Sequence, residues 1–345
     1  MKAIKLPSGN YRVRAYYKDS TGKIHRKSFT DPDRKVALAL AQQYVLSDKE
    51  PSRDTFGAAM DAFLASREPV LSPSTLRAYK TIAKTLRNEY GALCAAEMDA
   101  IRSSDLQDLV NDLLKEHAPR HKFQKERRKI SPNTVRNYAG FISAVFRSQN
   151  MLMPRVQLPE KVRPQISVPS DKEMSDILER VKGTAIEIPV KLAAFAPMRR
   201  GEICALSLDD ISGNVIHVHR SMVRDAAGNW IVKTPKTYSS DRYIEMPAKI
   251  IRQIKKAGVI TELTPDKLSD KFDELVKKDY PDLHFHCLRH WCASHLHAIG
   301  MPDVYIMRRG GWSTDSTLKA VYRHTLADQD QIQTKKALDN FGSFL

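Results

Sequence analysis

The chain has 345 residues, of which 42% are hydrophobic, so two or three folded domains are expected and a disordered chain is excluded. Lys and Arg number 56 against 40 Asp and Glu. The formal net charge of +16 predicts a polyanionic partner, nucleic acid before an anionic membrane surface. No apolar stretch has the length of a membrane span, the first residues contain no apolar signal segment, and the four cysteines have no disulfide spacing. We therefore expect a cytoplasmic protein with reduced thiols.

Residues 1–50 are predicted to form a small three-stranded β-sheet backed by one helix. Apolar and polar side chains alternate along 11–18, which is typical of a half-buried strand. A turn separates this strand from a returning strand at 23–29, and a helix follows to about Leu46.

One face of the strand at 11–18 is cationic. Residues 1–50 contain 11 Lys and Arg against five Asp and Glu. A sheet of this kind can lie in the major groove of DNA, although a solvated sheet face would have the same pattern. The candidate DNA-binding residues on this face are Arg12, Arg14, Tyr16 and Lys18.

Residues 52–152 are predicted to form an all-α domain with an internal repeat. The pattern Ser-Pro-x-Thr-x-Arg-x-Tyr begins at Ser72 and again at Ser131, and Ser followed by Pro is a helix-start signal. Each helix would then present its Arg and its Tyr toward phosphate near a positive helix end, although two helices can also share a start signal by chance. The candidate DNA contacts are Arg77 and Arg136.

Four further stretches complete the domain organisation. Residues 115–129 hold seven Lys or Arg and two Glu, which suits a loop that tracks a DNA backbone or a solvated loop. Four prolines in 153–170 exclude a helix and predict an extended linker. Residues 171–328 are predicted to be mainly α with a small antiparallel sheet. Residues 329–345 form a polar tail that docks on a neighbouring subunit or frays.

An arginine and a glutamate stand in an apolar setting at 196–206. Arg199 and Glu202 have apolar residues on both sides, so burying their charges is costly unless they are used. Their i, i+3 spacing lets the carboxylate hold the guanidinium in one pose. A purely structural ion pair is the competing interpretation.

Three short strand patterns follow, at 214–219, 230–232 and 242–246. Residues 233–240 are predicted to be the connecting turn of a hairpin. A lysine at such a tip can reach a neighbouring groove and donate a proton to a leaving oxygen. We choose Lys236 for this role and keep Lys233 as the alternative.

A histidine-rich helix begins near 286. His286, Arg289 and His290 lie beside its apolar face, close to the positive helix N-terminus, and predict a phosphate site. The i, i+4 spacing of the two histidines also suits zinc. However, no Glu follows the first histidine and no second ligand cluster has metal spacing, so no metal or other cofactor is predicted.

The last candidate residues follow a pair of glycines. Gly310-Gly311 ends one helix, Trp312 comes next, and a short helix from Thr314 or Asp315 carries Tyr322. An indole N–H can donate to a phosphate, and a phenol is a nucleophile that can be held covalently.

In order and local context, these residues resemble the tyrosine recombinase (phage-type integrase) family. The resemblance is strong over about residues 170–328 and looser over the two modules before it. Pro197 stands where the family usually has Gly, and Trp312 stands where His is commoner. The boxes that carry the resemblance are Arg199-Arg200-Gly201-Glu202, His286-Cys287-Leu288-Arg289-His290, Gly311-Trp312 and Val321-Tyr322-Arg323-His324.

The resemblance implies a role for each side chain in a cofactor-free DNA breaking and rejoining enzyme. The two clamp arginines would hold the phosphate, and the tyrosine would form a 3′-phosphotyrosyl intermediate. The first histidine would accept the phenolic proton, the lysine would protonate the leaving 5′ oxygen, and the indole would donate to the phosphate. The implied catalytic residues are Arg199, Lys236, His286, Arg289, Trp312 and Tyr322, with Glu202 and His290 as orienting groups.

The resemblance also implies partners and a domain plan. Residues 1–50 would bind arm-type DNA sites, 52–152 core-type sites, and 171–328 would be catalytic. A nucleoid-associated homo-tetramer would integrate or excise a mobile element or prophage, with an excisionase and a DNA-bending host protein as further partners. The alternatives are a type IB-like topoisomerase and a catalytically silent DNA-binding regulator.

Overall fold

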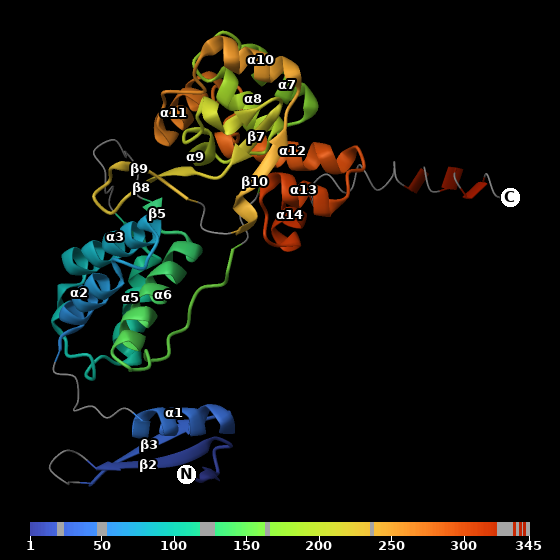
Figure 1. Cartoon of the computed structure of the whole chain (residues 1–345). Helices are drawn as coiled ribbons and strands as arrows, with labels where there is room; N and C mark the ends of the chain where they lie inside the picture. Colours follow the sequence, from blue (N-terminus) through green and yellow to red (C-terminus); the bar gives the residue numbers. More distant parts are fainter. Residues whose placement is uncertain are drawn as a thin grey trace. The chain divides into compact units, whose positions relative to one another are not determined.

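The computed structural model describes residues 1–18, 24–46, 54–117, 128–162, 166–234 and 238–322, and the pairs 334–335, 338–339 and 341–342. Two compact units are present. The first contains residues 1–70 and 78–162, and the second contains 71–77 and 163–345. Figure 1 labels their helices and strands.

The N-terminal module is an antiparallel sheet with one helix on one face, as predicted (Figure 1). Val13 and Ala15 alternate with polar residues and pack against Ala37 and Ala41 of the helix. The side chains of Arg12, Arg14 and Tyr16 alternate with these buried residues, and Tyr16 is 53% exposed. The side chain of Lys18 lies outside the described part. The elements are β1 (Ala3–Lys5), β2 (Tyr11–Lys18), β3 (Ile24–Asp31) and α1 (Arg34–Leu46).

A helical bundle follows in the chain, also as predicted, and all of it but residues 71–77 belongs to the first unit. Its core is aromatic: the ring of Phe141 lies 6.0 Å from that of Phe63 and 5.0 Å from that of Tyr79, centroid to centroid. A two-residue ladder joins β4 to β5. The elements are α2 (Phe56–Arg67), α3 (Pro73–Glu89), α4 (Gly91–Ala95), α5 (Ser103–Leu113), β4 (Glu116–His117), β5 (Arg128–Lys129) and α6 (Pro132–Ser148).

The repeated Ser-Pro motif starts α3 and α6, but its second tyrosine does not face solvent. Tyr138 is 4% exposed, so the prediction that it reaches toward phosphate was wrong, whereas Tyr79 is half-buried and packs on Phe141. The aromatic rings contribute more as core than they would at the surface. Arg77 and Arg136 are exposed, and one amino group of Arg136 donates to the carbonyl of Pro159 at 2.9 Å.

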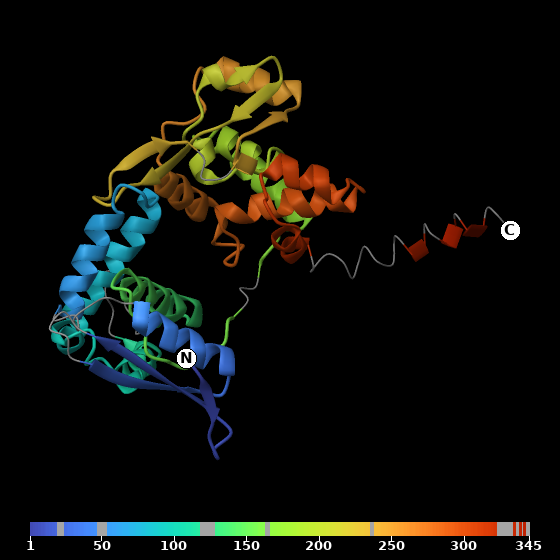
Figure 2. The same ribbon diagram turned by 60° about the horizontal axis from the view of Figure 1, so that its bottom comes forward.

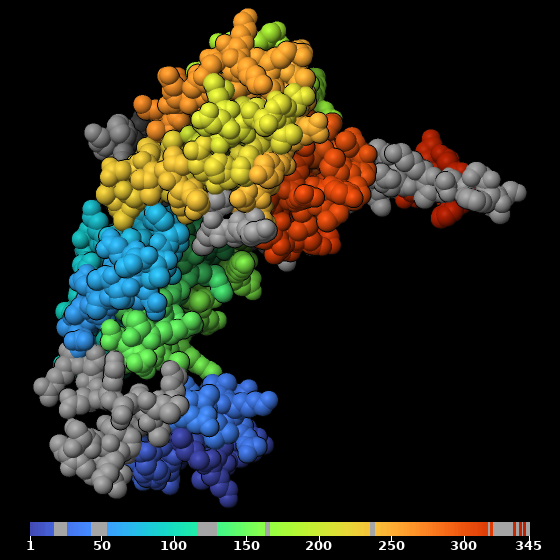
Figure 3. Space-filling model, in the orientation of Figure 1, coloured from blue at the N-terminus to red at the C-terminus, as the bar shows by residue number. Residues whose placement is uncertain are grey.

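The second unit surrounds a small sheet with helices. Its sheet has the order β10-β7-β6, and β8 and β9 form a separate hairpin that projects from the unit in Figures 1 and 2. The core lies between the sheet and the helices, and helices α12 to α14 form one continuous mass in Figure 3. The elements are α7 (Asp171–Arg180), α8 (Glu187–Phe195), α9 (Arg200–Ile203), η1 (Leu208–Asp210), β6 (Ile211–Ser212), β7 (Val215–Val218), β8 (Ser221–Arg224), β9 (Trp230–Lys233), η2 (Tyr238–Ser240), β10 (Arg242–Glu245), α10 (Ala248–Ala257), α11 (Pro265–Val276), α12 (Phe285–Ala298), α13 (Asp303–Gly310) and α14 (Asp315–Tyr322).

The strand pairing corrects one prediction. Residues 233–240 do not connect a hairpin, because β9 pairs with β8 and β10 pairs with β7. They instead join two different sheets. No strand was predicted at the position of β8, because it is four residues long and has polar residues at both ends.

None of the described helices is long and apolar enough to cross a membrane.

The start of α6 provides a test of local stability. The hydroxyl of Ser131 accepts from the backbone N–H of Thr134 at 3.2 Å, so Ser131→Ala should weaken the first turn by about 1 kcal/mol, whereas Ser131→Asn should retain the cap. Hydrogen exchange of the α6 amides, followed by mass spectrometry, measures this directly. Equal exchange in the two variants would exclude the cap as a source of stability.

Candidate active site

Glu202 lies between two arginines at the start of α9. Its Oε1 accepts from Nη1 of Arg199 at 2.6 Å, and its Oε2 accepts from the backbone N–H of the same residue at 2.9 Å. The carboxylate therefore fixes both the backbone and the guanidinium of Arg199. Nη2 of Arg199 donates to the carbonyl of Gly311 at 3.1 Å, and 39% of this side chain remains exposed.

Arg242 of β10 is the second partner of Glu202. Its Nη2 lies 2.8 Å from Oε2 and its Nη1 lies 3.3 Å from Oε1, and the side chain is only 3% exposed. Burial alone would raise the pKa of Glu202, but the charge and hydrogen bonds of Arg242, and then Arg199, lower it to about 2. Glu202 is therefore an anion at neutral pH.

Arg242 was not among the residues predicted from the sequence, although a signal was present. Residues alternate along β10 between buried and exposed positions, and Arg242 shares its face with the buried Ile244. A charged residue on the buried face of a strand requires a partner. That pattern could have identified it.

Arg289 is the most deeply buried charge of the site. The side chain is 1% exposed, and its Nη1 donates to the carbonyl of Pro197. Its Nη2 has no hydrogen-bond partner, and no ion pair joins it to a carboxylate in the described parts of the chain. Burial, followed by repulsion from Arg199, lowers the pKa of Arg289 from its ordinary value. A guanidinium nevertheless stays protonated in proteins, so the chain buries a cation whose Nη2 has no hydrogen-bond partner among the described residues.

Trp312 covers this guanidinium. The Cζ of Arg289 lies 3.9 Å from the centroid of the indole ring, in cation–π contact. A Cβ on Gly310 would lie 1.8 Å from that ring, so only glycine permits the ring to fold back here. The indole is 8% exposed and belongs to a small core with Ala293 and Leu318.

The two histidines of α12 are neutral at physiological pH. Burial lowers the pKa of His286 to about 4, with Arg289 adding to the effect, and burial together with His286 lowers the pKa of His290 to about 3. The two rings meet edge to face, 4.6 Å between centroids. A neutral imidazole can accept a proton, whereas an imidazolium cannot.

Two of the predicted catalytic residues, Lys236 and Tyr322, lie wholly or partly outside the described part of the structure. Lys236 lies outside the described residues. Its alternative, Lys233, is the last residue of β9 and pairs with Ser221. Tyr322 ends α14, one turn after the buried Leu318, and its side chain is not among those described.

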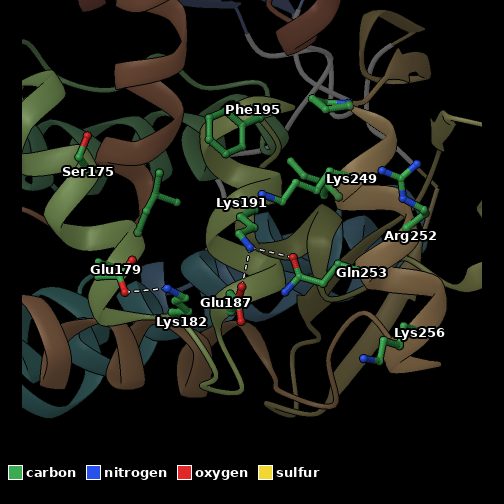
Figure 4. Close-up of a pocket in the computed structure, with 13 residues that line it drawn as sticks. Ser175, Glu179, Lys182, Glu187, Lys191, Phe195, Lys249, Arg252, Gln253 and Lys256 are labelled. Atoms are coloured by element: carbon green, nitrogen blue, oxygen red, sulfur yellow. Dashed lines mark hydrogen bonds and ion pairs between the residues drawn. The ribbon is translucent and has the colours of Figure 1, made fainter.

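A separate cavity of about 780 Å³ lies between α7, α8 and α10, and none of the predicted catalytic residues lines it (Figure 4). Its central lysine is already satisfied: Nζ of Lys191 lies 2.5 Å from Glu187 and 2.7 Å from Gln253. Across the described ranges, no group of three or more His, Cys, Asp or Glu residues is arranged to hold a metal ion.

Comparison with known proteins agrees with this geometry. Residues 170–329 match the model of the phage integrase family. A "Tyrosine recombinase XerC-like" protein of Caldanaerobacter subterraneus subsp. tengcongensis is 24% identical over 382 aligned positions, which cover 94% of this chain and 95% of the relative.

Two groups of solved structures share the fold. An integrase of the transposon Tn1549, solved with circular intermediate DNA, has a TM-score of 0.65 at 15% identity, over 82% of this chain and 99% of that one. A lambda integrase tetramer bound to a Holliday junction gives 0.57 at 17% identity, over 92% and 94%. Residues 170–329 therefore resemble the phage integrase family, and the chain is similar over 94% of its length to a tyrosine recombinase.

Proposed function

We propose that this chain is a site-specific DNA recombinase that integrates or excises a mobile element or prophage through a 3′-phosphotyrosyl intermediate. The observation that carries the proposal is the buried Nη2 of Arg289, which has no partner among the described residues, together with the half-exposed guanidinium of Arg199. Two cations with free donors suit one phosphate of a DNA strand, because charge-assisted hydrogen bonds to an anion relieve the cost of burial.

The chemical step needs a nucleophile next to this phosphate. The packing of Leu318 on Ala293 and Trp312 fixes the helix that carries Tyr322 against α12. The Tyr322 oxygen attacks phosphorus, the bond to the 5′ oxygen breaks, and the phosphate remains on the tyrosine. The neutral His286 takes the phenolic proton, and Lys236, or Lys233, gives a proton to the leaving oxygen.

The remaining groups support this step. The arginines stabilise the charge that develops on the non-bridging oxygens, and Trp312 donates to the phosphate through its indole N–H. Glu202 and His290 orient the clamp and the base. Reversal with the 5′ hydroxyl of another strand reseals DNA without an external energy source.

The domain plan of the proposal follows the module boundaries. Residues 1–50 bind arm-type sites, 52–152 bind core-type sites, 153–170 link them to the catalytic domain at 171–328, and 329–345 are the C-terminal tail. The net charge of +16 favours double-stranded DNA as the partner. The lambda relative forms a tetramer on a Holliday junction, and we propose the same assembly here, with an excisionase and a DNA-bending protein as accessory partners.

A nicked suicide duplex tests the nucleophile. The wild-type chain should form a covalent DNA adduct that survives denaturing electrophoresis, because the short strand lost at the nick cannot attack back. Tyr322→Phe should form none and should bind the duplex with unchanged affinity. Tyr305→Phe, a matched change at a tyrosine that is 59% exposed on α13, should trap as the wild type does.

The same substrate separates the alternatives. A silent regulator would bind without an adduct. A type IB-like topoisomerase would form the adduct and relax supercoiled plasmid without joining strands of two duplexes. An adduct in Tyr322→Phe would remove the proposed nucleophile.

The buried histidines predict a pH dependence of stability. An unfolded histidine has a pKa near 6.5, so between pH 6.5 and 4 the unfolded chain binds more protons than the folded one. Stability therefore falls as the pH falls through this window. From pH 7 to pH 5, His286 should contribute a loss of about 1–2 kcal/mol, discounted for its partial exposure.

Urea unfolding followed by tryptophan fluorescence measures this loss in the second unit, which contains all three tryptophans. His286→Asn should show a shallower decline than the wild type below pH 6.5 and the same slope above pH 7. Parallel curves at all pH values would mean that His286 is not held neutral.

A further inference from the structure

Arg242 uses nearly all of its hydrogen-bonding capacity inside the protein. A guanidinium has five N–H donors. The two Nη atoms bind Glu202, Nη1 also donates to the carbonyl of Ser240 at 3.0 Å, and Nε donates to the carbonyl of Arg309 at 2.8 Å. The side chain is 3% exposed, so it has neither the donors nor the access to bind a phosphate itself.

These bonds join three segments that contribute to the proposed active site. Glu202 belongs to the arginine box, Ser240 follows the stretch with Lys236, and Arg309 precedes Trp312. Gly311, which precedes Trp312, also lies close to Arg242. A Cβ added to Gly311 would lie 3.1 Å from Nη1 of Arg242. The buried guanidinium of Arg242 therefore joins strand β10 to the segment that carries Glu202 and to the segment that carries Arg309.

The charges of Arg199, Glu202 and Arg242 sum to one positive charge. Glu202 alone would neutralise Arg199, to which it is joined at 2.6 Å. Arg242 supplies the second cation that balances the carboxylate, and its charge lowers the pKa of Glu202 more than that of Arg199 does. The positive charge of Arg199 consequently remains available to an external anion.

We propose that Arg242 is a positioning residue that balances the charge of Glu202, so that Glu202 can orient Arg199 without cancelling its attraction for the scissile phosphate. This inference rests on the proposed function. Loss of Arg242 leaves Glu202 buried with one partner, and the clamp then loses net charge while keeping its shape around Arg199.

Single-turnover cleavage of the nicked suicide duplex tests this proposal in the full chain. Arg242→Gln should slow adduct formation on the order of 10²-fold, as expected for lost charge stabilisation in a transition state, with the dissociation constant for DNA changed less than about threefold. The double variant Glu202→Gln/Arg242→Gln removes the unbalanced carboxylate as well. It should form the adduct at least about tenfold faster than Arg242→Gln alone.

An uncharged scissile group gives a readout that a merely structural role would not move. On a duplex with a methylphosphonate at the cleavage position, the transition state carries one negative charge fewer. The defect of Arg242→Gln should therefore shrink to less than about tenfold. An equal defect on both substrates, together with a double variant as slow as the product of the two single changes, would overturn the charge-balancing role.

Two controls separate folding from chemistry. Arg180→Gln removes another arginine held by two carboxylates, Asp176 at 2.7 Å and Asp279 at 2.5 Å, and should cleave at the wild-type rate. Arg242→Lys keeps the cation and gives up the fork. It should lose less activity on the phosphodiester than Arg242→Gln, and a lysine variant as slow as the glutamine variant would contradict the proposal.

The outcomes also separate this inference from the proposed function. If the wild-type chain forms no adduct, the recombinase chemistry fails and Arg242 has no clamp to balance. If the wild type forms the adduct and the Arg242 variants match it, the proposed function stands and the role of Arg242 is excluded.

Discussion

The site depends on a cation that the protein buries and does not neutralise. Arg289 is 1% exposed, and in the described residues one carbonyl oxygen and one indole face are its recorded partners. Such a group raises the free energy of the folded state unless something outside the chain completes its hydrogen bonds. The surrounding residues follow from this constraint: Gly310 lets the indole close over the guanidinium, and the carbonyl of Pro197 accepts from it.

Three arginines near Glu202 and Trp312 differ in how much of their capacity the fold consumes. Arg242 uses nearly all of its donors within the protein, where it makes four hydrogen bonds. Arg199 keeps 39% of its side chain exposed, and Arg289 is buried with an Nη2 that has no partner in the described part of the chain. Arg242 therefore keeps the site in shape, whereas Arg199 and Arg289 retain donors for an anion. Electrostatic groups fixed before the substrate arrives stabilise developing charge without having to reorganise.

Most of the fold was predictable from the sequence because short-range rules decide it. The alternation at 11–18 identified β2, and the Ser-Pro pairs identified the starts of α3 and α6. The arginine, histidine and tryptophan boxes were recognised as boxes, and the structure brings Arg199, Arg289 and Trp312 to one place.

Long-range pairing was not predictable in the same way. Strands β9 and β10 are close in sequence but join different partners, and nothing in their local pattern says so. The sequence around Tyr138 is compatible with a surface hydrogen-bond donor and with a core residue. Only the packing of the helical bundle shows that it is a core residue. The position of Arg242 on the buried face of β10 was a signal that it needs a partner, but the partners themselves lie 40 and 67 positions away and could not be named from the sequence.

A crystal structure of the chain on a nicked core-type duplex, with vanadate bound at the nick, tests the central point most directly. We expect vanadate oxygens within about 3 Å of Nη2 of Arg289 and of the Arg199 guanidinium, with the oxygen of Tyr322 as an axial ligand. Vanadate bound away from these groups, with Nη2 of Arg289 still unpartnered, would contradict the view that this buried cation exists to hold the DNA phosphate.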